Sequence, residues 1–362
     1  MKRILSILSV ATLFLLSACG ALQNGVSQSG APATGGPGLG LTVYFIDVGQ
    51  ADSALVLCDG AAMLIDGGNA ADSDLIYAFL KERGVSHLAY IVGTHAHEDH
   101  IGGLAGALNY ATIDTALCPV TESESGAFRN FVKYLGAQGK TVSVPRPGDI
   151  FTLGGAEFTI LGPIKPTSEP NNTSIVLKLT YGAVRFLFTG DCERDEEADI
   201  LETGRDLSAT VLKVGHHGSE TGTSYPFLRE IMPQYAVISC GEHNSYGHPH
   251  EATLSKLRDA DVTVFRTDMQ GTITATSDGR TVNFTVERNA DAQTNPTAAD
   301  RRTLVPSGAP QTADAARIGN RNTQVYHAPD CKSLPDLKNR VYFDSREEAE
   351  AAGMRPHEAC GA

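Results

Sequence analysis

The run from Thr94 to His100, THAHEDH, is the feature that most constrains what this chain can fold into. It places three histidines and an aspartate within six positions, directly after an apolar stretch typical of a β-strand. Imidazole and carboxylate groups suit zinc or a similar divalent ion, and two such ions side by side can bind both the attacking and the leaving oxygen of a hydrolysis. The run therefore predicts a centre with two divalent metal ions, Zn or Mn, and metal-assisted hydrolysis.

Length and pattern predict one large domain with appendages. Of the 362 residues, 41% are apolar, which is enough for a sizeable core. Between residues 41 and 287, β-branched runs alternate with helical ones, which predicts an α/β (α+β) fold of two mixed sheets covered by helices. A stretch without apolar periodicity at 288–322 predicts a linker. The predicted strands are 41–47, 54–58, 62–66, 88–92, 115–117, 157–161, 174–180, 184–189, 210–214, 236–239, 262–265, 272–276 and 282–286, and the predicted helices are 74–83, 127–135 and 193–201.

Further metal-binding side chains follow other predicted strands. Asp191, the pair His216-His217, and His248 each come just after one of these strands. Functional loops usually begin where strands end, so we expect these side chains to meet the His95 run at one edge of the fold.

Several motifs resemble those of the metallo-β-lactamase superfamily. They are the H-x-H-x-D-H signature at 95–100, Asp66 within LIDGG, and TGD at 189–191. Finer motifs resemble the exported hydrolase domain of ComEC-type competence proteins: FIDVGQAD at 45–52, NNTS at 171–174, LKVGHHGS at 212–219 and NSYGHP at 244–249. The resemblance covers residues 41 to 286 and implies a four-layer αββα sandwich with the metals at one edge of the paired sheets.

The resemblance also implies roles for individual residues. His95 and His97 would hold the first metal and Asp99 and His100 the second, with Asp191 bridging the two ions. In addition, His248 would complete the second metal, and Asp66 would orient the ligand loop by hydrogen bonds.

The chain departs from the superfamily pattern at one ligand. Many members place another histidine between the signature and the bridging aspartate, whereas no histidine occurs here from residue 101 to residue 190. Asn171 and Asn172 stand near that place, but an amide oxygen is a poor zinc ligand compared with imidazole. We therefore hypothesise that His216 or His217 supplies the missing ligand of the first metal.

Other polar side chains near these motifs are candidates for catalysis or for contact with the substrate. Asp99 could accept a proton as well as bind metal, and Lys213 could offset negative charge that develops on a phosphoryl oxygen. The alternative interpretation of Lys213 is a solvated lysine at a strand end. The turn at Ser219, the amides near Asn172, and Asn244 could contact the metal ligands or the substrate.

The N-terminus predicts export. Residues 1–18 have the layout of a secretory signal, with Lys2 and Arg3 before an apolar run too short to span a bilayer. The ending LSAC resembles the lipobox of bacterial lipoproteins, which implies lipid attachment at Cys19; the alternative is an ordinary cleaved signal. The Gly-, Ser- and Pro-rich stretch 19–40 predicts a flexible tether. We expect an exported cell-surface or envelope lipoprotein, anchored to the membrane through Cys19 and without a transmembrane channel of its own.

A small metal-binding module is predicted at 323–362. His327 and Cys331 are spaced H-x3-C, and His357 and Cys360 are spaced H-x2-C, which suits one structural zinc ion. The segment is similar to the small zinc-binding module of Ada-type DNA-repair proteins, although His357 stands where that family usually has cysteine. The alternative is a disulfide between Cys331 and Cys360, which an oxidising compartment permits.

The charge of the chain limits how it could bind a polyanion. A formal net charge of −13 argues against a broadly basic surface for nucleic acid, so the metals and a few cations would have to hold such a substrate. The leading hypothesis, taken from the resemblance, is a phosphodiesterase or nuclease acting on extracellular DNA. The alternatives are hydrolysis of another envelope ester or of a β-lactam, and a metal-binding envelope protein with little turnover.

Overall fold

A computed structural model describes residues 40–297, 317–328, 331, 334, 335, 339–343 and 345–357. The predicted signal peptide, Cys19, nearly all of the tether, residues 298–316 of the predicted linker, and Cys360 lie outside the described residues. Within those ranges, no helix has the length and apolar character that crossing a membrane requires.

The first sheet is mixed and has its strands in the order β15-β14-β1-β2-β3-β4-β5-β6. β1 pairs antiparallel with β2 and β14, whereas β3, β4 and β5 run parallel to one another. The strand bounds are β1 Leu41–Phe45, β2 Ala54–Cys58, β3 Ala61–Ile65, β4 His87–Val92, β5 Thr112–Leu117, β6 Val142–Ser143, β14 Ile273–Ser277 and β15 Val282–Val286.

The second sheet has the order β13-β12-β11-β10-β9-β8-β7. β10, β11, β12 and β13 run parallel, and β7, β8 and β9 add antiparallel strands on the other side. The strand bounds are β7 Ile150–Leu153, β8 Ala156–Gly162, β9 Val176–Tyr181, β10 Val184–Phe188, β11 Val211–Lys213, β12 Tyr235–Ile238 and β13 Thr263–Arg266.

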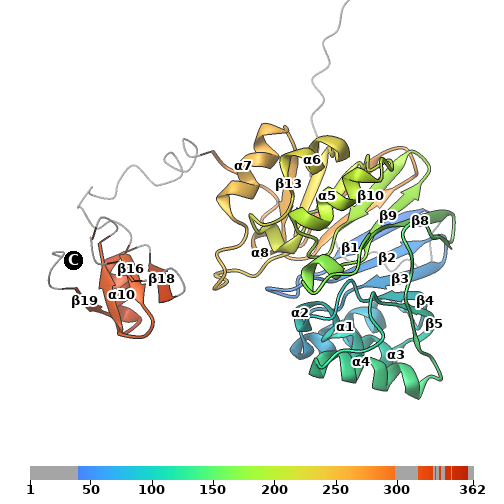
Figure 1. Ribbon diagram of the computed structural model, residues 1–362, viewed down its shortest axis with the longest axis horizontal. Helices are drawn as coiled ribbons and strands as arrows, with labels where there is room; N and C mark the ends of the chain where they lie inside the picture. The colour runs from blue at the N-terminus through green and yellow to red at the C-terminus, as the bar shows by residue number, and fades with distance from the viewer. Residues whose placement is uncertain are drawn as a thin grey trace, which may run out of the picture.

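Helices cover the outer faces of the two sheets (Figure 1). One group of helices, α1, α3 and α4, packs on the first sheet through one buried apolar cluster. The other group, α5, α6 and α7, packs on the second sheet through another such cluster. The helix bounds are α1 Ser73–Glu82, α2 Glu98–Ile101, α3 Leu104–Tyr110, α4 Gly126–Ala137, α5 Arg194–Glu202, α6 Tyr225–Ile231, α7 Glu251–Asp259 and α8 Thr267–Gln270.

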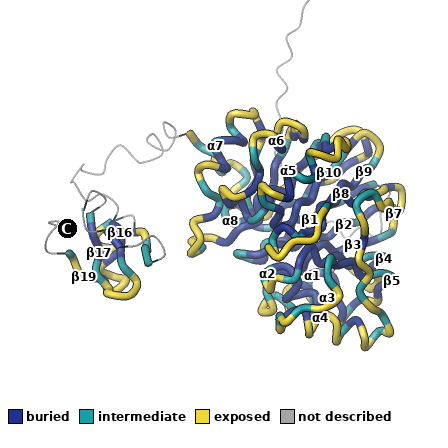
Figure 2. The backbone as a smooth tube through the Cα atoms, in the orientation of Figure 1, coloured by how far each residue is buried: buried dark blue, intermediate teal, exposed yellow. Residues whose placement is uncertain are grey.

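A third apolar cluster fills the space between the sheets, where the backbone is buried (Figure 2). Alternation along β1 places Val43 and Phe45 inside, and Phe45 stacks on Phe188 of the facing sheet with ring centroids 6.0 Å apart. The four-layer αββα sandwich of the metallo-β-lactamase type is therefore confirmed.

Most predicted strands are present within a few residues of their expected bounds, but several short helices were not predicted. α3 shows the reason, because Gly106 looks like a helix breaker in the sequence. In the structure, a Cβ at Gly106 would lie 1.9 Å from the Ser73 carbonyl oxygen, so only glycine allows α3 to pack this closely against α1.

The first residues of the predicted linker belong to the hydrolase domain. Thr294 is buried, and Asn295 donates to the Leu254 carbonyl at 3.0 Å. Arg288 lies 3.2 Å from a carboxylate oxygen of Asp47. The described contacts of Asn295 and Arg288 are polar. For this reason the segment has no apolar periodicity, and the sequence did not show that it is part of the domain.

The tail module is a four-stranded sheet in the order β18-β16-β17-β19 with one helix, α10. Its bounds are β16 Arg317–Asn320, β17 Val325–His327, β18 Arg340–Phe343, α10 Arg346–Ala351 and β19 Arg355–Pro356. β16 lies within the stretch that the sequence predicted as a linker, and it pairs with both β17 and β18. The strand was not predicted because Gly319 and Asn320 are residues that are rare in strands. Ser345 caps α10 by accepting from the Glu348 N–H at 3.2 Å.

Candidate metal centre

The predicted ligand residues meet at the carboxyl ends of strands from both sheets. The loop after β4 carries His95, His97, Asp99 and His100, and the loop after β3 carries Asp66. On the facing sheet, the loops after β10 and β11 carry Asp191 and the His216-His217 pair. Segments distant in sequence thus form one site, as expected for side chains that follow strand ends.

Four of these residues form a tight group that we call the inner set: Asp99, His100, Asp191 and His217. One ligand atom from each lies within 4.8 Å of all the others. His100 Nε2 is 3.2 Å from Asp191 Oδ1, and His217 Nε2 is 3.2 Å from Asp99 Oδ2. Within the described residues, His100 Nε2 and Asp191 Oδ1 are buried without a hydrogen-bond partner, and a cation between them would satisfy both.

Three further histidines lie beside the inner set, and we call His95, His97 and His216 the outer set. His95 Nε2 is 2.9 Å from His97 Nδ1 and 4.0 Å from Asp191 Oδ2. His216 Nε2 reaches the same Asp191 oxygen at 3.7 Å. Two ligand atoms of one tetrahedral zinc lie roughly 3.4 Å apart, and the compact inner set suits such an ion. The outer set is more open, because His95 and His216 are related to it through their distances to Asp191 Oδ2.

His216 and His217 owe their divergent directions to an unusual backbone. Their φ angles are 48° and 52°, so two consecutive non-glycine residues lie in the left-handed region. Such conformations are unfavourable and persist where surrounding structure holds them, which is frequent at functional sites. The turn directs His216 to the outer set and His217 to the inner set, so each of the two histidines has a place.

The structure groups His217, and not His248, with Asp99, His100 and Asp191, whereas the resemblance implied His248 as a ligand of the second metal. The rings of His216 and His217 lie 5.6 and 6.2 Å from the His248 ring, centroid to centroid. Gln50 Oε1 accepts from the Gly241 N–H at 3.0 Å, so the Gln50 amide nitrogen faces His248 Nδ1 at 3.2 Å. In this arrangement Nδ1 accepts a hydrogen bond and the ring proton lies on Nε2. Burial lowers the pKa of His248 to about 3, so the ring is neutral.

Asp66 holds the ligand loop in the way the resemblance implied. Its two carboxylate oxygens accept from the backbone N–H and the hydroxyl of Thr94, both at 2.7 Å. Asp66 Oδ2 also lies 2.9 Å from His100 Nδ1, which leaves His100 Nε2 to face the inner set.

Lys213 differs from both predictions made for it. Its ammonium is buried and lies 2.8 Å from Asp52 Oδ2, so it neither contacts solvent nor faces a substrate with unpaired charge. Asp52 Oδ1 in turn lies 3.3 Å from His217 Nδ1. Sequence reasoning missed Asp52 as a site residue, although it ends the FIDVGQAD motif.

Electrostatic pairing keeps the inner carboxylates ionised. Burial works against charge on Asp191, but His100 and His217 outweigh it and hold the pKa of Asp191 well below its usual range. Burial likewise disfavours charge on His217, but Asp191 and Asp52 raise the pKa of His217 to about 10. An ionised carboxylate among imidazoles is the donor set that borderline divalent ions prefer.

The remaining predicted polar residues shape the loops. Asn171 Nδ2 donates to Glu193 Oε1 at 3.2 Å, and Asn172 Oδ1 accepts from the Glu193 N–H at 3.0 Å. Ser219 Oγ accepts from the Thr221 N–H at 3.3 Å. Asn244 Nδ2 donates to the His248 carbonyl at 2.6 Å, and its Oδ1 accepts from the His248 N–H at 3.0 Å.

An open cavity of about 570 Å³ adjoins His248. The loop at 241–248 forms one wall, and Arg266, Asp268, Arg288 and Asn289 form the others. Arg266 is paired with Asp268 at 2.6 Å, so the lining contains charges of both signs.

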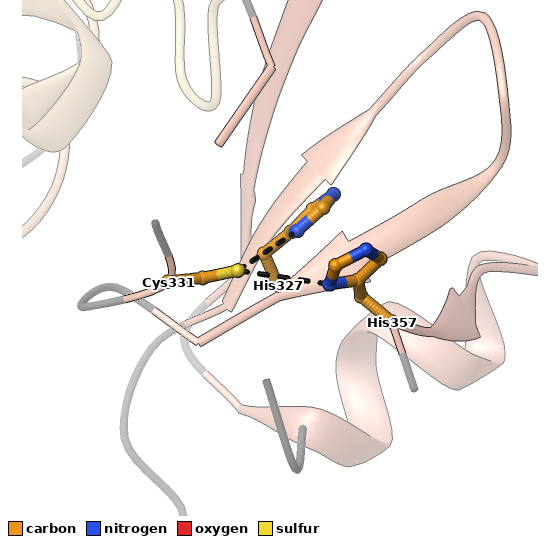
Figure 3. Close-up of side chains that lie close together, drawn as sticks. All are labelled: His327, Cys331 and His357. Carbon is orange, nitrogen blue, oxygen red and sulfur yellow. Dashed lines mark hydrogen bonds between the residues drawn. The ribbon is translucent and has the colours of Figure 1, made fainter. Parts of the chain in front are cut away.

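The tail module contains a separate candidate metal site (Figure 3). Cys331 Sγ lies 3.4 Å from His327 Nδ1 and 3.6 Å from His357 Nδ1. One ligand atom from each of the three residues lies within 4.8 Å of the others, and His327 is buried. Three of the four predicted ligands are thus together, and the fourth, Cys360, lies outside the described residues.

Comparison with known families agrees with this geometry. A sequence profile of the metallo-beta-lactamase superfamily matches residues 46–243, and the chain belongs to this superfamily. A second profile, for the metal-binding domain of Ada, matches residues 302–361. The protein therefore combines a domain of the metallo-beta-lactamase superfamily with an Ada-like zinc-binding module.

The chain is also similar to individual curated proteins and solved structures. The chain is 29% identical over 263 residues to ComE operon protein 3 of Bacillus subtilis, with 67% of this chain and 34% of that protein covered. It is 31% identical over 230 residues to competence protein ComA of Neisseria gonorrhoeae, with 63% and 31% covered. The chain thus spans about a third of the length of these relatives. Among solved structures, the metallo-beta-lactamase fold protein YhfI of Bacillus subtilis is similar, with 16% identity, coverage of 62% of this chain and 95% of that one, and a TM-score of 0.42.

Proposed function

We propose that this protein is an exported, metal-dependent phosphodiesterase whose substrate is DNA outside the cytoplasm. The observation that carries the proposal is the arrangement of imidazoles on both sides of Asp191, in a chain similar to a protein named competence protein ComA. Two divalent ions bound there would supply Lewis acidity and lower the pKa of a water molecule towards neutrality. The side chains of the protein would orient the substrate and transfer protons.

Asp99 and His248 are the groups that face the reacting atoms in this proposal. The Asp99 side chain is 31% exposed, so it can accept a proton from the attacking water while it holds a metal. His248 carries its proton on Nε2, and within the described residues no side chain accepts from that atom. It can therefore donate to a phosphoryl oxygen of the substrate.

We expect the leaving group of the substrate to occupy the cavity beside His248. Arg288 is 42% exposed at its wall and can meet a phosphate, while the acidic balance of the chain keeps nonspecific binding weak. We expect a nuclease that its metals direct to the substrate, with few cationic contacts to the DNA backbone.

Attachment to the membrane through Cys19 is part of the proposal. A lipid anchor and the tether after it would hold the catalytic domain near DNA at the cell surface. Replacement of Cys19 by serine should move the protein from the membrane fraction to the soluble exported fraction. Retention of the Cys19→Ser variant in the membrane would exclude this anchor.

Cleavage assays with several substrates test the chemistry. Labelled single- and double-stranded DNA, bis(p-nitrophenyl) phosphate and a chromogenic β-lactam are incubated with the protein and Mn²⁺ or Zn²⁺. We expect metal-dependent cleavage of DNA and of the phosphodiester, abolished by chelation. Turnover of the β-lactam alone, or of no substrate, would contradict the proposal.

A further inference from the structure

One loop carries two carboxylates with different surroundings. Asp191 lies between the two ligand sets, and Glu193, two residues later, lies beside His216 with its Oε1 atom 3.1 Å from His216 Nδ1. The Thr221 hydroxyl donates to the same Glu193 oxygen at 2.9 Å. The Glu193 carboxylate is thus fixed on the side of the imidazole that faces away from Asp191.

This contact determines what His216 can do. The Glu193 carboxylate accepts a hydrogen bond from the Nδ1–H of His216. The proton of the neutral ring therefore stays on Nδ1, and the free lone pair of His216 lies on Nε2. That Nε2 atom is the one 3.7 Å from Asp191 Oδ2. Glu193 therefore gives His216 the tautomer and the direction of a metal ligand.

Asn171 and Asn172 hold Glu193 in place. Asn171 donates to the Glu193 side chain at 3.2 Å, and Asn172 accepts from the Glu193 backbone at 3.0 Å. These two residues stand near the place where many superfamily members have a histidine ligand, yet both bind Glu193. The side chain of Glu193 makes no cap for α5, so capping this helix does not account for its position.

We propose that Glu193 is a positioning residue that makes His216 the ligand of the outer metal, in place of the histidine that this chain lacks. Asn171, Asn172 and Thr221 support the carboxylate. The inference rests on the two-metal centre of the proposed function and deepens it, because it states how the outer ion obtains its third imidazole.

The binding of Mn²⁺, followed by electron paramagnetic resonance on the full-length protein, tests this inference without any substrate. Two adjacent ions give an exchange-coupled signal, which the thiolate-containing tail site does not produce. We expect Glu193→Ala to weaken binding of one of the two ions by about 10- to 100-fold and to leave a single-ion signal at concentrations that saturate the wild type. Glu193→Gln should keep most of the affinity, because its amide oxygen still accepts from Nδ1.

The controls separate positioning from general damage. Glu202→Gln changes a mostly exposed glutamate at the end of α5 and should leave the coupled signal unchanged. His216→Ala should lose the same ion as Glu193→Ala. If Glu193→Ala does not fold, Asn171→Ala, which removes one hydrogen bond to Glu193, should weaken the same ion several-fold.

A wild-type coupled signal in Glu193→Ala, or in Asn171→Ala where that variant replaces it, would overturn the inference. A protein that binds the ion pair as described but cleaves no phosphodiester would overturn only the proposed function.

Discussion

The two candidate metal sites of this protein stand in very different surroundings. The hydrolase centre lies at the ends of strands from two large sheets, with a separate apolar cluster between the sheets and another under each helical layer. The tail site lies in a module whose described buried apolar residues are few: Ile318, Tyr326, Phe343, Ala349 and Met354. The comparison teaches that one metal site adds chemistry to a fold that is stable without it, whereas the other supplies folding free energy to a module too small to be stable alone.

The largest effect should come from the bridging carboxylate. Asp191→Asn removes the charge that both ligand sets share, and we expect cleavage of phosphodiesters to fall by about 10³-fold or more. The hydrolase domain should stay folded because its apolar clusters remain, although the loss of the charge that pairs with His100 and His217 should lower its melting temperature. Steady-state kinetics and calorimetry measure the two quantities, with Asp195→Asn, an exposed neighbour, as the control. Unfolding of the domain in Asp191→Asn would break the contrast with the tail.

Removal of the tail metal should have the opposite result. Chelation, or Cys331→Ser, should unfold the tail module and leave the hydrolase domain folded. Limited proteolysis would show rapid digestion after about residue 316 with a stable core fragment. If the module stays protected without metal and loses protection only under reducing conditions, the disulfide alternative is correct instead.

His248 sharpens the comparison within the hydrolase centre. We expect His248→Asn to lower kcat by about 10- to 100-fold while the protein keeps both metals, because its Nε2 donates to substrate. The metal content and the steady-state kinetics of the variant are measured together. His87→Gln, a change at a half-exposed histidine, serves as the control. Loss of one ion from His248→Asn would show that it is a ligand after all.

A smaller effect tests the claim that buried groups, not metal, set the stability of the hydrolase domain. Burial raises the pKa of Glu196 to about 7, so the folded state binds its proton more tightly than the unfolded chain does. This contribution is complete below the unfolded pKa near 4.5 and is lost as the pH rises through 7.

We therefore expect Glu196→Gln to be more stable than the wild type at pH 8 by about 1 kcal/mol, with no gain at pH 4. Urea unfolding at both pH values measures it, with Glu202→Gln for reference. An equal difference at the two pH values would mean that Glu196 is not the titrating group.

Local patterns predicted two mixed sheets covered by helices, and the resemblance added the four-layer sandwich and the grouping of Asp99, His100 and Asp191. Period-2 burial along strands such as β1 and the tight spacing of His95 to His100 are visible without coordinates. The choice between His217 and His248 was not predictable in this way. It depends on two left-handed residues and on a hydrogen bond from Gln50, which lies 198 positions from His248 in the chain. The burial of Lys213 against Asp52 is equally nonlocal, across 161 positions.

The most direct test of the central claim is anomalous diffraction from crystals grown with zinc. We expect two peaks about 3.5–4 Å apart in the hydrolase domain, one bound by His95, His97 and His216 and the other by Asp99, His100 and His217, with Asp191 touching both. A single peak there, or a pair of ions that Asp191 does not bridge, would contradict the account.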